Sequence, residues 1–179
     1  PLGAELLPRL AREAAALARI RDPGLVAVHE VQLEGPHPYL AMDLIEGESL
    51  ERRLQRTGPL PPAPAVRIAL ALARTLSRLP AQQVVHRDLK ASNVILRPDD
   101  RPVLLDLGLA LLLDHQLRLT RTGELLGTPH CMAPEQVQGA RDEVGPASDV
   151  WALGVLLCRL LAGRPPFPGG SALATLEQV

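Results

Sequence analysis

The chain has 179 residues, a formal net charge of −1 at pH 7 and 46% hydrophobic residues. This length and apolar content allow one compact domain with a buried core, and the near-neutral charge excludes a general attraction to nucleic acid or anionic membranes. Cys131 and Cys158 form no CxxC pair, no signal peptide or bilayer-length apolar stretch is present, and we therefore expect a reducing, cytoplasmic setting without disulfides or a zinc site.

The first part of the chain predicts one helix followed by strands. Apolar periodicity indicates a helix over residues 6–20, which Asp22-Pro23-Gly24 ends because proline and glycine both break helical backbone. Two strand-like runs follow, Leu25 to Leu33 and Tyr39 to Asp43. Ser49 is then a candidate N-cap for a short helix through residue 56.

The remainder of the chain is mainly helical in pattern. A proline-rich turn opens a helix from Ala63 to Leu79, and short strands are expected within Val84 to Leu96 and Arg101 to Ala110. Leu111 to Ala133 has no stable period and indicates a loop, whereas Ala147 to Ala162 is so apolar that we expect a helix buried on most sides. This order predicts an α+β fold with a helical main lobe.

One short segment carries a full set of groups for phosphoryl transfer, His86-Arg87-Asp88-Leu89-Lys90-Ala91-Ser92-Asn93. Transfer from a nucleotide requires a carboxylate for the hydroxyl proton, a cation for the moving phosphoryl group and oxygen ligands for Mg²⁺. Asp88, Lys90 and Asn93 supply one of each, and Asp106 adds a second hard oxygen ligand further along.

This segment, followed by Asp106-Leu107-Gly108 and Ala133-Pro134-Glu135, resembles the protein kinase family, and most closely its bacterial serine/threonine members of the eukaryotic type. The resemblance covers essentially the whole chain. The alternative is that these motifs are chance tripeptides in turns, but their joint order and spacing favour the kinase interpretation.

The resemblance implies a role for each matching residue. Asp88 is the expected catalytic base, Lys90 contacts the transferred phosphate, and Asn93 and Asp106 hold Mg²⁺. Arg87 is expected to bind a phosphate on the activation loop. His86 is expected to be a packed structural histidine and not a base.

The same resemblance implies an ATP site. Leu40-Ala41-Met42-Asp43-Leu44-Ile45-Glu46-Gly47 resembles the hinge between the two kinase lobes. Met42 is then the gatekeeper, the backbone of Asp43 and Ile45 meets the adenine edge, and Ile95 packs under the adenine ring. Glu13 resembles the glutamate that pairs with a lysine in the small lobe. The alternatives are an ordinary strand ending in a glycine turn and a solvated helix glutamate.

The resemblance also implies a regulated activation segment. Thr128 is expected to bridge Asp88 and Lys90, and Thr120 and Thr122 lie where activating phosphorylation is expected. The alternative for these residues is plain loop threonines. Asp149 is expected to accept hydrogen bonds from the catalytic-loop backbone; it also suits a helix N-terminus.

The pattern departs from the family in several places. No glycine-rich loop precedes Glu13, the only lysine is Lys90, and the arginine that normally pairs with Glu135 is missing. Cys131 stands where the family usually has tyrosine, which places substrate docking in question. We expect a kinase fragment, with residues 1–45 from the small lobe and 46–179 from the large lobe, that is unstable or inactive by itself.

We therefore interpret the parent protein as an ATP- and Mg²⁺-dependent kinase that phosphorylates serine or threonine on proteins, itself included. The rival hypothesis is a pseudokinase that scaffolds partners without turnover. Retention of the four polar residues named for catalysis favours the enzyme. Nucleic acid is not an expected partner, and membrane anchoring through other parts of a longer protein is left open.

Overall fold

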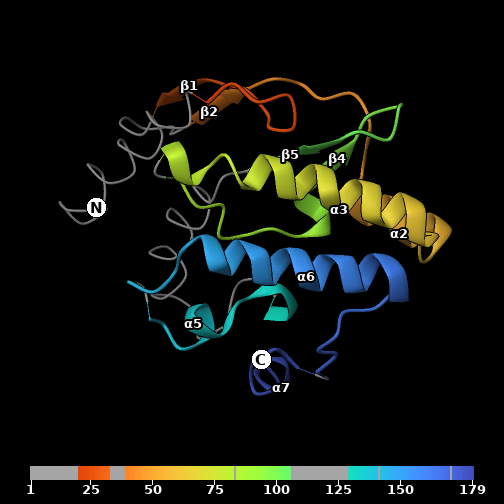
Figure 1. Cartoon of the computed structure of the whole chain (residues 1–179), viewed down its shortest axis with the longest axis vertical. Coiled ribbons are helices and arrows are strands. Elements are labelled where there is room, and N and C mark those ends of the chain that lie inside the picture. The colour runs from red at the N-terminus through yellow and green to blue at the C-terminus, as the bar shows by residue number, and fades with distance from the viewer. Residues whose placement is uncertain (1–19, 33–38, 83, 106–128, 141, 170) are drawn as a thin grey trace.

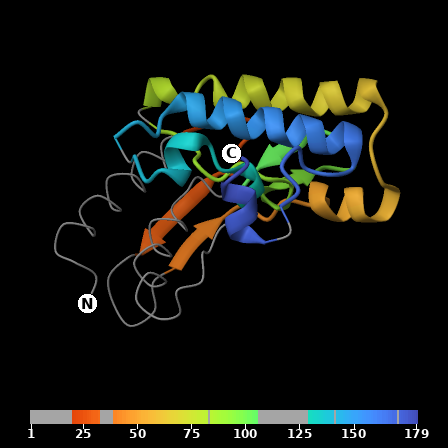
Figure 2. The same ribbon diagram turned by 90° about the horizontal axis from the view of Figure 1, so that it is seen from below.

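The computed structural model describes residues 20–32, 39–82, 84–105, 129–140, 142–169 and 171–179. These residues form the predicted α+β fold, with two small antiparallel sheets beside a largely helical body. Helices α3 (Pro62–Leu76) and α6 (Pro146–Ala162) lie side by side and run in opposite directions in both views (Figures 1 and 2).

The first sheet pairs β1 (Val28–Gln32) with β2 (Tyr39–Met42), and a register shift lies between Val28 and Glu30. The strand expected from Leu25 begins later than predicted. Leu25 donates its N–H to Asp22 O at 3.0 Å in the preceding turn and forms only a parallel bridge with Leu104. The turn therefore delays regular pairing, although the predicted strand is present.

The second sheet has the order β3–β4–β5, formed by β3 (Glu48–Ser49), β4 (Val94–Leu96) and β5 (Pro102–Leu104). Of the short strands predicted within Val84 to Leu96, the structure forms β4, whereas the described residues from Val84 to Asn93 make no strand pairing. Val84 N–H bonds to Leu79 O, and residues 91–93 form a 3₁₀ turn. Val84 and Leu89 are therefore buried in a loop and not in a sheet.

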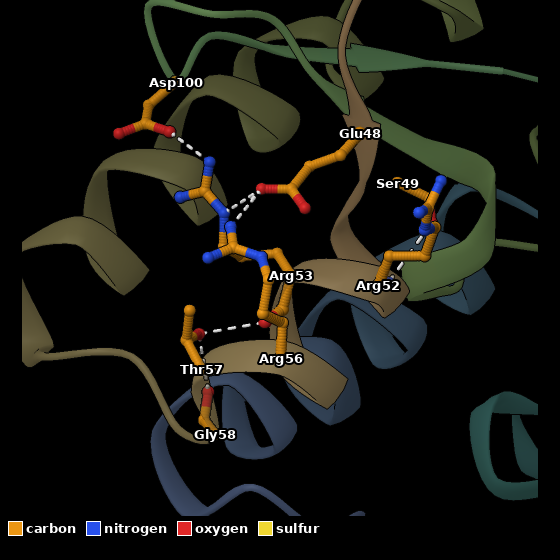
Figure 3. Close-up of polar contacts among 8 residues, drawn as sticks. All are labelled: Glu48, Ser49, Arg52, Arg53, Arg56, Thr57, Gly58 and Asp100. Carbon is orange, nitrogen blue, oxygen red and sulfur yellow. Dashed lines mark hydrogen bonds and ion pairs between the residues drawn. The ribbon is translucent and has the colours of Figure 1, made fainter.

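Helix α2 (Leu50–Thr57) begins at the predicted N-cap, because Ser49 Oγ accepts the Arg52 N–H at 3.2 Å. An ionic cluster beside it ties the helix to the sheet (Figure 3). Arg53 bonds to Glu48 and, at 3.0 Å, to Asp100 in the β4–β5 turn, while Arg56 reaches the same Glu48 oxygen at 2.7 Å. The cluster holds α2 against the strands that flank the predicted catalytic loop.

The core lies where α3 and α6 meet. Their buried side chains include Ile68, Leu72 and Leu156, and Leu60 N–H donates to Leu160 O at 2.7 Å where the two helix ends meet. The expectation that α6 is buried on most sides is wrong. One face is buried, while Val150 and Leu161 on the same helix are 68% and 42% exposed.

The other described elements are short. Helices α5 (Pro134–Val137) and α7 (Ala172–Leu176) and the 3₁₀ turns at Pro80–Gln82, Ala91–Asn93 and Pro129–Cys131 were not predicted as separate elements. The predicted helix over residues 6–20 lies outside the described residues except for Ile20. None of the described helices combines the length and the apolar character that a membrane crossing needs.

Candidate active site

The segment from His86 to Asn93 is held in place by the start of α6. Asp149 lies in the first turn of that helix, and its two carboxylate oxygens accept the backbone N–H groups of His86, at 2.9 Å, and Arg87, at 2.8 Å. Asp149 is 4% exposed, so these amides are its buried partners. The prediction that Asp149 anchors this loop is confirmed.

Three predicted catalytic side chains meet at one carboxylate. Lys90 Nζ lies 2.6 Å from Asp88 Oδ2, and Asn93 Nδ2 donates to the same oxygen at 3.0 Å and to the Asp88 backbone carbonyl at 2.9 Å. The Asp88 and Lys90 side chains are 18% and 22% exposed, so both retain access to solvent. The Asp88 carboxylate is held by a cation and an amide and is open on one side. It is therefore suited to receive or orient a proton.

The imidazole of His86 connects this loop to the chain that precedes Asp106. The Asp88 N–H donates to His86 Nδ1 at 3.2 Å, so Nε2 carries the ring hydrogen and donates to Leu105 O at 3.0 Å. His86 is fully buried, which confirms a packed, structural histidine. Leu105 N–H also donates to Asn93 O at 2.8 Å, which fixes the backbone before Asp106 from both sides.

The predicted hinge joins the two sheets. Asp43 donates its backbone N–H to Ala27 O at 2.9 Å, so of its two backbone groups the carbonyl oxygen is the one left for the predicted adenine contact. Gly47 has φ +150°, and an added Cβ there would lie 2.1 Å from Leu96 O and 2.9 Å from Ile95 Cγ2. Only glycine lets the hinge pass this close to β4, the strand that directly follows Asn93.

The side chains predicted to line the nucleotide site are partly open. Met42 ends β2 and is 38% exposed. Ile45 and Ile95 are half-buried, and Ile95 pairs with Ser49 across β3 and β4. The Asp43 carboxylate instead bonds to His29 Nε2 at 2.7 Å on the exposed surface.

The short helix α5 and the turn before it lie against the catalytic loop. Cys131 is partly buried there, and burial raises the pKa of its thiol to about 11, with the nearby Asp88 carboxylate adding to the increase and the positive charges of Arg159 and Lys90 opposing it. The arginine that the family usually pairs with Glu135 was expected to be missing, and in the described residues Glu135 instead accepts a hydrogen bond from the buried Ser148 hydroxyl of α6.

Sequence reasoning missed one residue at this junction. Gln136 accepts the Ala133 N–H through Oε1 and donates from Nε2 to the Arg87 carbonyl, each at 2.9 Å. The spacing of Ala133 and Gln136 is that of a helix N-cap and its third residue, a pattern that indicates the first bond but not the second.

Five of the predicted site residues lie outside the described residues: Glu13, Asp106, Thr120, Thr122 and Thr128. In the part of the chain that is described, no group of three His, Cys, Asp or Glu side chains gathers as a metal centre. Asn93 commits its amide nitrogen to Asp88, so its Oδ1 is the oxygen that suits Mg²⁺.

A kinase-type catalytic core has three features that this chain shows. A hinge joins two antiparallel sheets, one loop gathers Asp88, Lys90 and Asn93, and a buried aspartate holds the backbone of that loop. The family model described as "Protein kinase domain" matches residues 4–179. The chain belongs to the protein kinase domain family.

Individual relatives refine this assignment. The chain is 43% identical over 178 residues to serine/threonine-protein kinase PkaA of Streptomyces coelicolor, covering 98% of this chain and 32% of the relative. It is 38% identical to serine/threonine-protein kinase PknL of Mycobacterium tuberculosis, with 97% and 43% covered. It is 39% identical to the DNA damage-responsive serine/threonine-protein kinase RqkA of Deinococcus radiodurans, with 95% and 26% covered. The chain thus spans less than half the length of each of these relatives.

Proposed function

We propose that this chain is the catalytic part of a protein kinase that transfers the γ-phosphate of ATP to serine or threonine side chains of proteins. The observation that carries the proposal is the convergence of Lys90 Nζ and Asn93 Nδ2 on Asp88 Oδ2, at 2.6 and 3.0 Å. Relatives named serine/threonine-protein kinases support the same activity. We divide the chain into a small-lobe part, residues 1–45, and a large-lobe part, residues 46–179.

Asp88 and Lys90 have different roles in the transfer. The substrate hydroxyl oxygen forms a bond to the γ-phosphorus as the bond to the β–γ bridging oxygen breaks, and ADP departs. The hydroxyl proton passes to the Asp88 carboxylate and then to solvent. The Lys90 ammonium, 2.6 Å from Asp88, offsets the negative charge of the moving phosphoryl group beside that carboxylate.

Asn93 and Asp106 are the proposed Mg²⁺ ligands. The oxygen of Asn93 and the carboxylate of Asp106 are the hard donors that this ion prefers, usually together with substrate phosphates. When bound, Mg²⁺ supplies positive charge at the phosphates of ATP. The residue that precedes Asp106 in the sequence, Leu105, donates its N–H to Asn93 O and accepts a hydrogen bond from His86, which supports this pair of ligands.

The nucleotide base is proposed to lie along the hinge. The Asp43 carbonyl and the Ile45 backbone meet the adenine edge, Ile95 packs under the ring and Met42 lies behind it. The Asp43 N–H is already bonded to Ala27, which supports the carbonyl as its contribution. Glu13 is proposed to orient a small-lobe lysine. ATP dependence also favours a cytoplasmic location, where the nucleotide is available.

Regulation is proposed to act through the activation segment. Phosphate on Thr120 or Thr122, including phosphate from autophosphorylation, is proposed to bind the Arg87 guanidinium. Thr128 is proposed to contact Asp88 and Lys90 through its hydroxyl. The substrates are proteins that present a serine or threonine hydroxyl to Asp88.

Replacing Asp88 with Asn tests the proposal in the full-length protein. Asp88→Asn keeps the shape of the side chain but removes the proton acceptor, so we expect phosphate transfer from γ-labelled ATP to fall by about 10²–10⁴-fold while ATP still binds. Asp99→Asn is the matched control, because Asp99 is half-exposed and bonds to Arg101 in a turn. Equal transfer by wild type and Asp88→Asn contradicts the role proposed for Asp88, whereas no transfer by either protein supports a scaffold role.

A further inference from the structure

Arg87, the residue before the proposed catalytic aspartate, has an unusual backbone conformation. Its φ is +66°, a left-handed value that few residues other than glycine adopt readily. A non-glycine residue persists in this strained region only where its surroundings hold it. The position of Asp88 therefore depends on contacts that maintain Arg87 in this conformation.

Two side chains from different helices hold the backbone of Arg87. Its N–H donates to Asp149 Oδ1 of α6 at 2.8 Å, and its carbonyl accepts Gln136 Nε2 of α5 at 2.9 Å. The peptide groups before and after the left-handed residue are thus both fixed. The second of these groups is the one that joins Arg87 to Asp88.

The Gln136 amide has a defined orientation. Its Oε1 accepts the Ala133 N–H at 2.9 Å, and a carbonyl such as that of Arg87 requires a donor, so Nε2 must point toward Arg87. One side chain therefore joins the Ala133 end of the activation segment to the peptide that carries Asp88. Capping α5 needs only Oε1, which leaves the bond from Nε2 as the contact that a capping role does not explain.

We propose that Gln136 is a positioning residue for phosphoryl transfer, which sets the Asp88 carboxylate by holding the Arg87 carbonyl and ties it to the segment that follows the activation loop. This inference rests on the proposed kinase function. Gln136 does not touch the reacting atoms, and its influence passes through the Arg87–Asp88 peptide. Misplacement of a catalytic group by about 1 Å is enough to slow an enzyme by up to about a hundredfold.

Substitutions that separate the two hydrogen bonds of Gln136 test this role in the full-length protein. Gln136→Glu keeps an oxygen for the Ala133 N–H but replaces the donor with an oxygen that repels the Arg87 carbonyl. Gln136→Met removes both bonds. Gln138→Glu is the matched control, because it makes the same chemical change on the exposed end of α5.

For Gln136→Glu we expect kcat to fall about tenfold or more, with little change in the KM for ATP and in the melting temperature. Gln136→Met should lose kcat to a similar extent and melt at a lower temperature, and Gln138→Glu should match wild type. A purely capping role predicts the opposite: wild-type kcat for Gln136→Glu and a loss only in Gln136→Met. That result overturns the inference.

A second measurement does not depend on activity. Hydrogen–deuterium exchange of the peptide spanning residues 84–90 should be faster in Gln136→Glu than in Gln138→Glu or wild type, since the Arg87 and Asp88 amides lose one of their restraints. Unchanged exchange contradicts the inference even if wild type transfers no phosphate. If wild type transfers no phosphate but Gln136→Glu still exchanges faster than wild type, the positioning contact is supported and only the proposed kinase function is contradicted.

Discussion

The Asp88 carboxylate interacts with three neighbouring side chains. Lys90 and Asn93 share one Asp88 oxygen, while Cys131 lies within electrostatic reach of the same carboxylate. The thiol stands where the kinase family usually has a tyrosine. Its partial burial, not an interaction with a cation, controls its protonation, so it is a neutral side chain at physiological pH.

This raised thiol pKa predicts a pH-dependent stability. Below about pH 9, Cys131 is protonated in both the folded and the unfolded chain and makes no difference. Between about pH 9 and 11 the unfolded chain ionises first, because its pKa is near 9.0 and the folded value is about 11, so stability falls as pH rises through this window. Cys131→Ala should show a shallower decline in melting temperature over that window than wild type.

Cys158→Ala provides the matched control, because Cys158 is an exposed cysteine on α6. It should follow the wild-type decline in melting temperature. Parallel curves for wild type and Cys131→Ala above pH 9 would show that burial of this thiol has no role in alkaline stability.

At the scale of single residues, the sequence predicted which groups carry the chemistry but not which side chains hold those groups in position. Asp88, Lys90 and Asn93 could be predicted because their residue types and spacing match the needs of phosphoryl transfer. Gln136 could not, because its bond to Arg87 joins positions far apart in the chain, and no local spacing encodes such a contact. The hydroxyl partner of Glu135, Ser148, escaped prediction for the same reason.

Individual elements were predicted well where a local signal sets their ends. Ser49 caps α2 as its side chain requires, and α3 begins in the proline-rich turn. The strand predicted from Val84 failed because the loop meets its hydrogen-bonding needs through Asp149 and Leu79, neither of which is a neighbouring strand. Val84 and Leu89 are buried in this loop, and burial of apolar side chains does not require a sheet.

Substitutions at two glycines test how closely the hinge approaches β4. Gly47→Ala places a Cβ against the Leu96 carbonyl at a φ that other residues avoid, so we expect the free energy of unfolding to fall by about 1–3 kcal/mol. Gly154→Ala, in the middle of α6 with open space around it, should raise it by about 0.5–1 kcal/mol. Urea unfolding of both variants measures the difference, and a stable Gly47→Ala would rule out the close approach of the hinge to β4.

Across the whole molecule, stability depends on the face that α3 shares with α6. Helix α6 also connects to α2, since Arg159 bonds to Glu51 of α2 at 2.7 Å. Because Asp149 at the start of α6 holds the catalytic loop, a loss of packing between α3 and α6 should reach the proposed active site. The overall α+β class could be predicted, but the pairing of these two helices could not, because their apolar faces have no sequence-local partner.

Truncating one core side chain tests this dependence. Leu72→Ala removes a fully buried side chain from α3, and we expect the free energy of unfolding to fall by about 2–5 kcal/mol. Leu70→Ala on the same helix is the control, because Leu70 is 49% exposed and its truncation should change stability by no more than about 0.5 kcal/mol. Equal losses in chemical denaturation would mean that this face of α3 is not the core.

The stacked rings of Trp151 and Phe167, with centroids 5.8 Å apart and planes within 2°, pair the chain's single tryptophan with its single phenylalanine. Fluorescence excited selectively from tryptophan therefore reports on one place within this chain, the contact between α6 and the segment that follows it. Circular dichroism averages over every helix. Agreement of the two signals during unfolding would indicate that this corner melts together with the rest, and an earlier change in emission would reveal that it opens by itself.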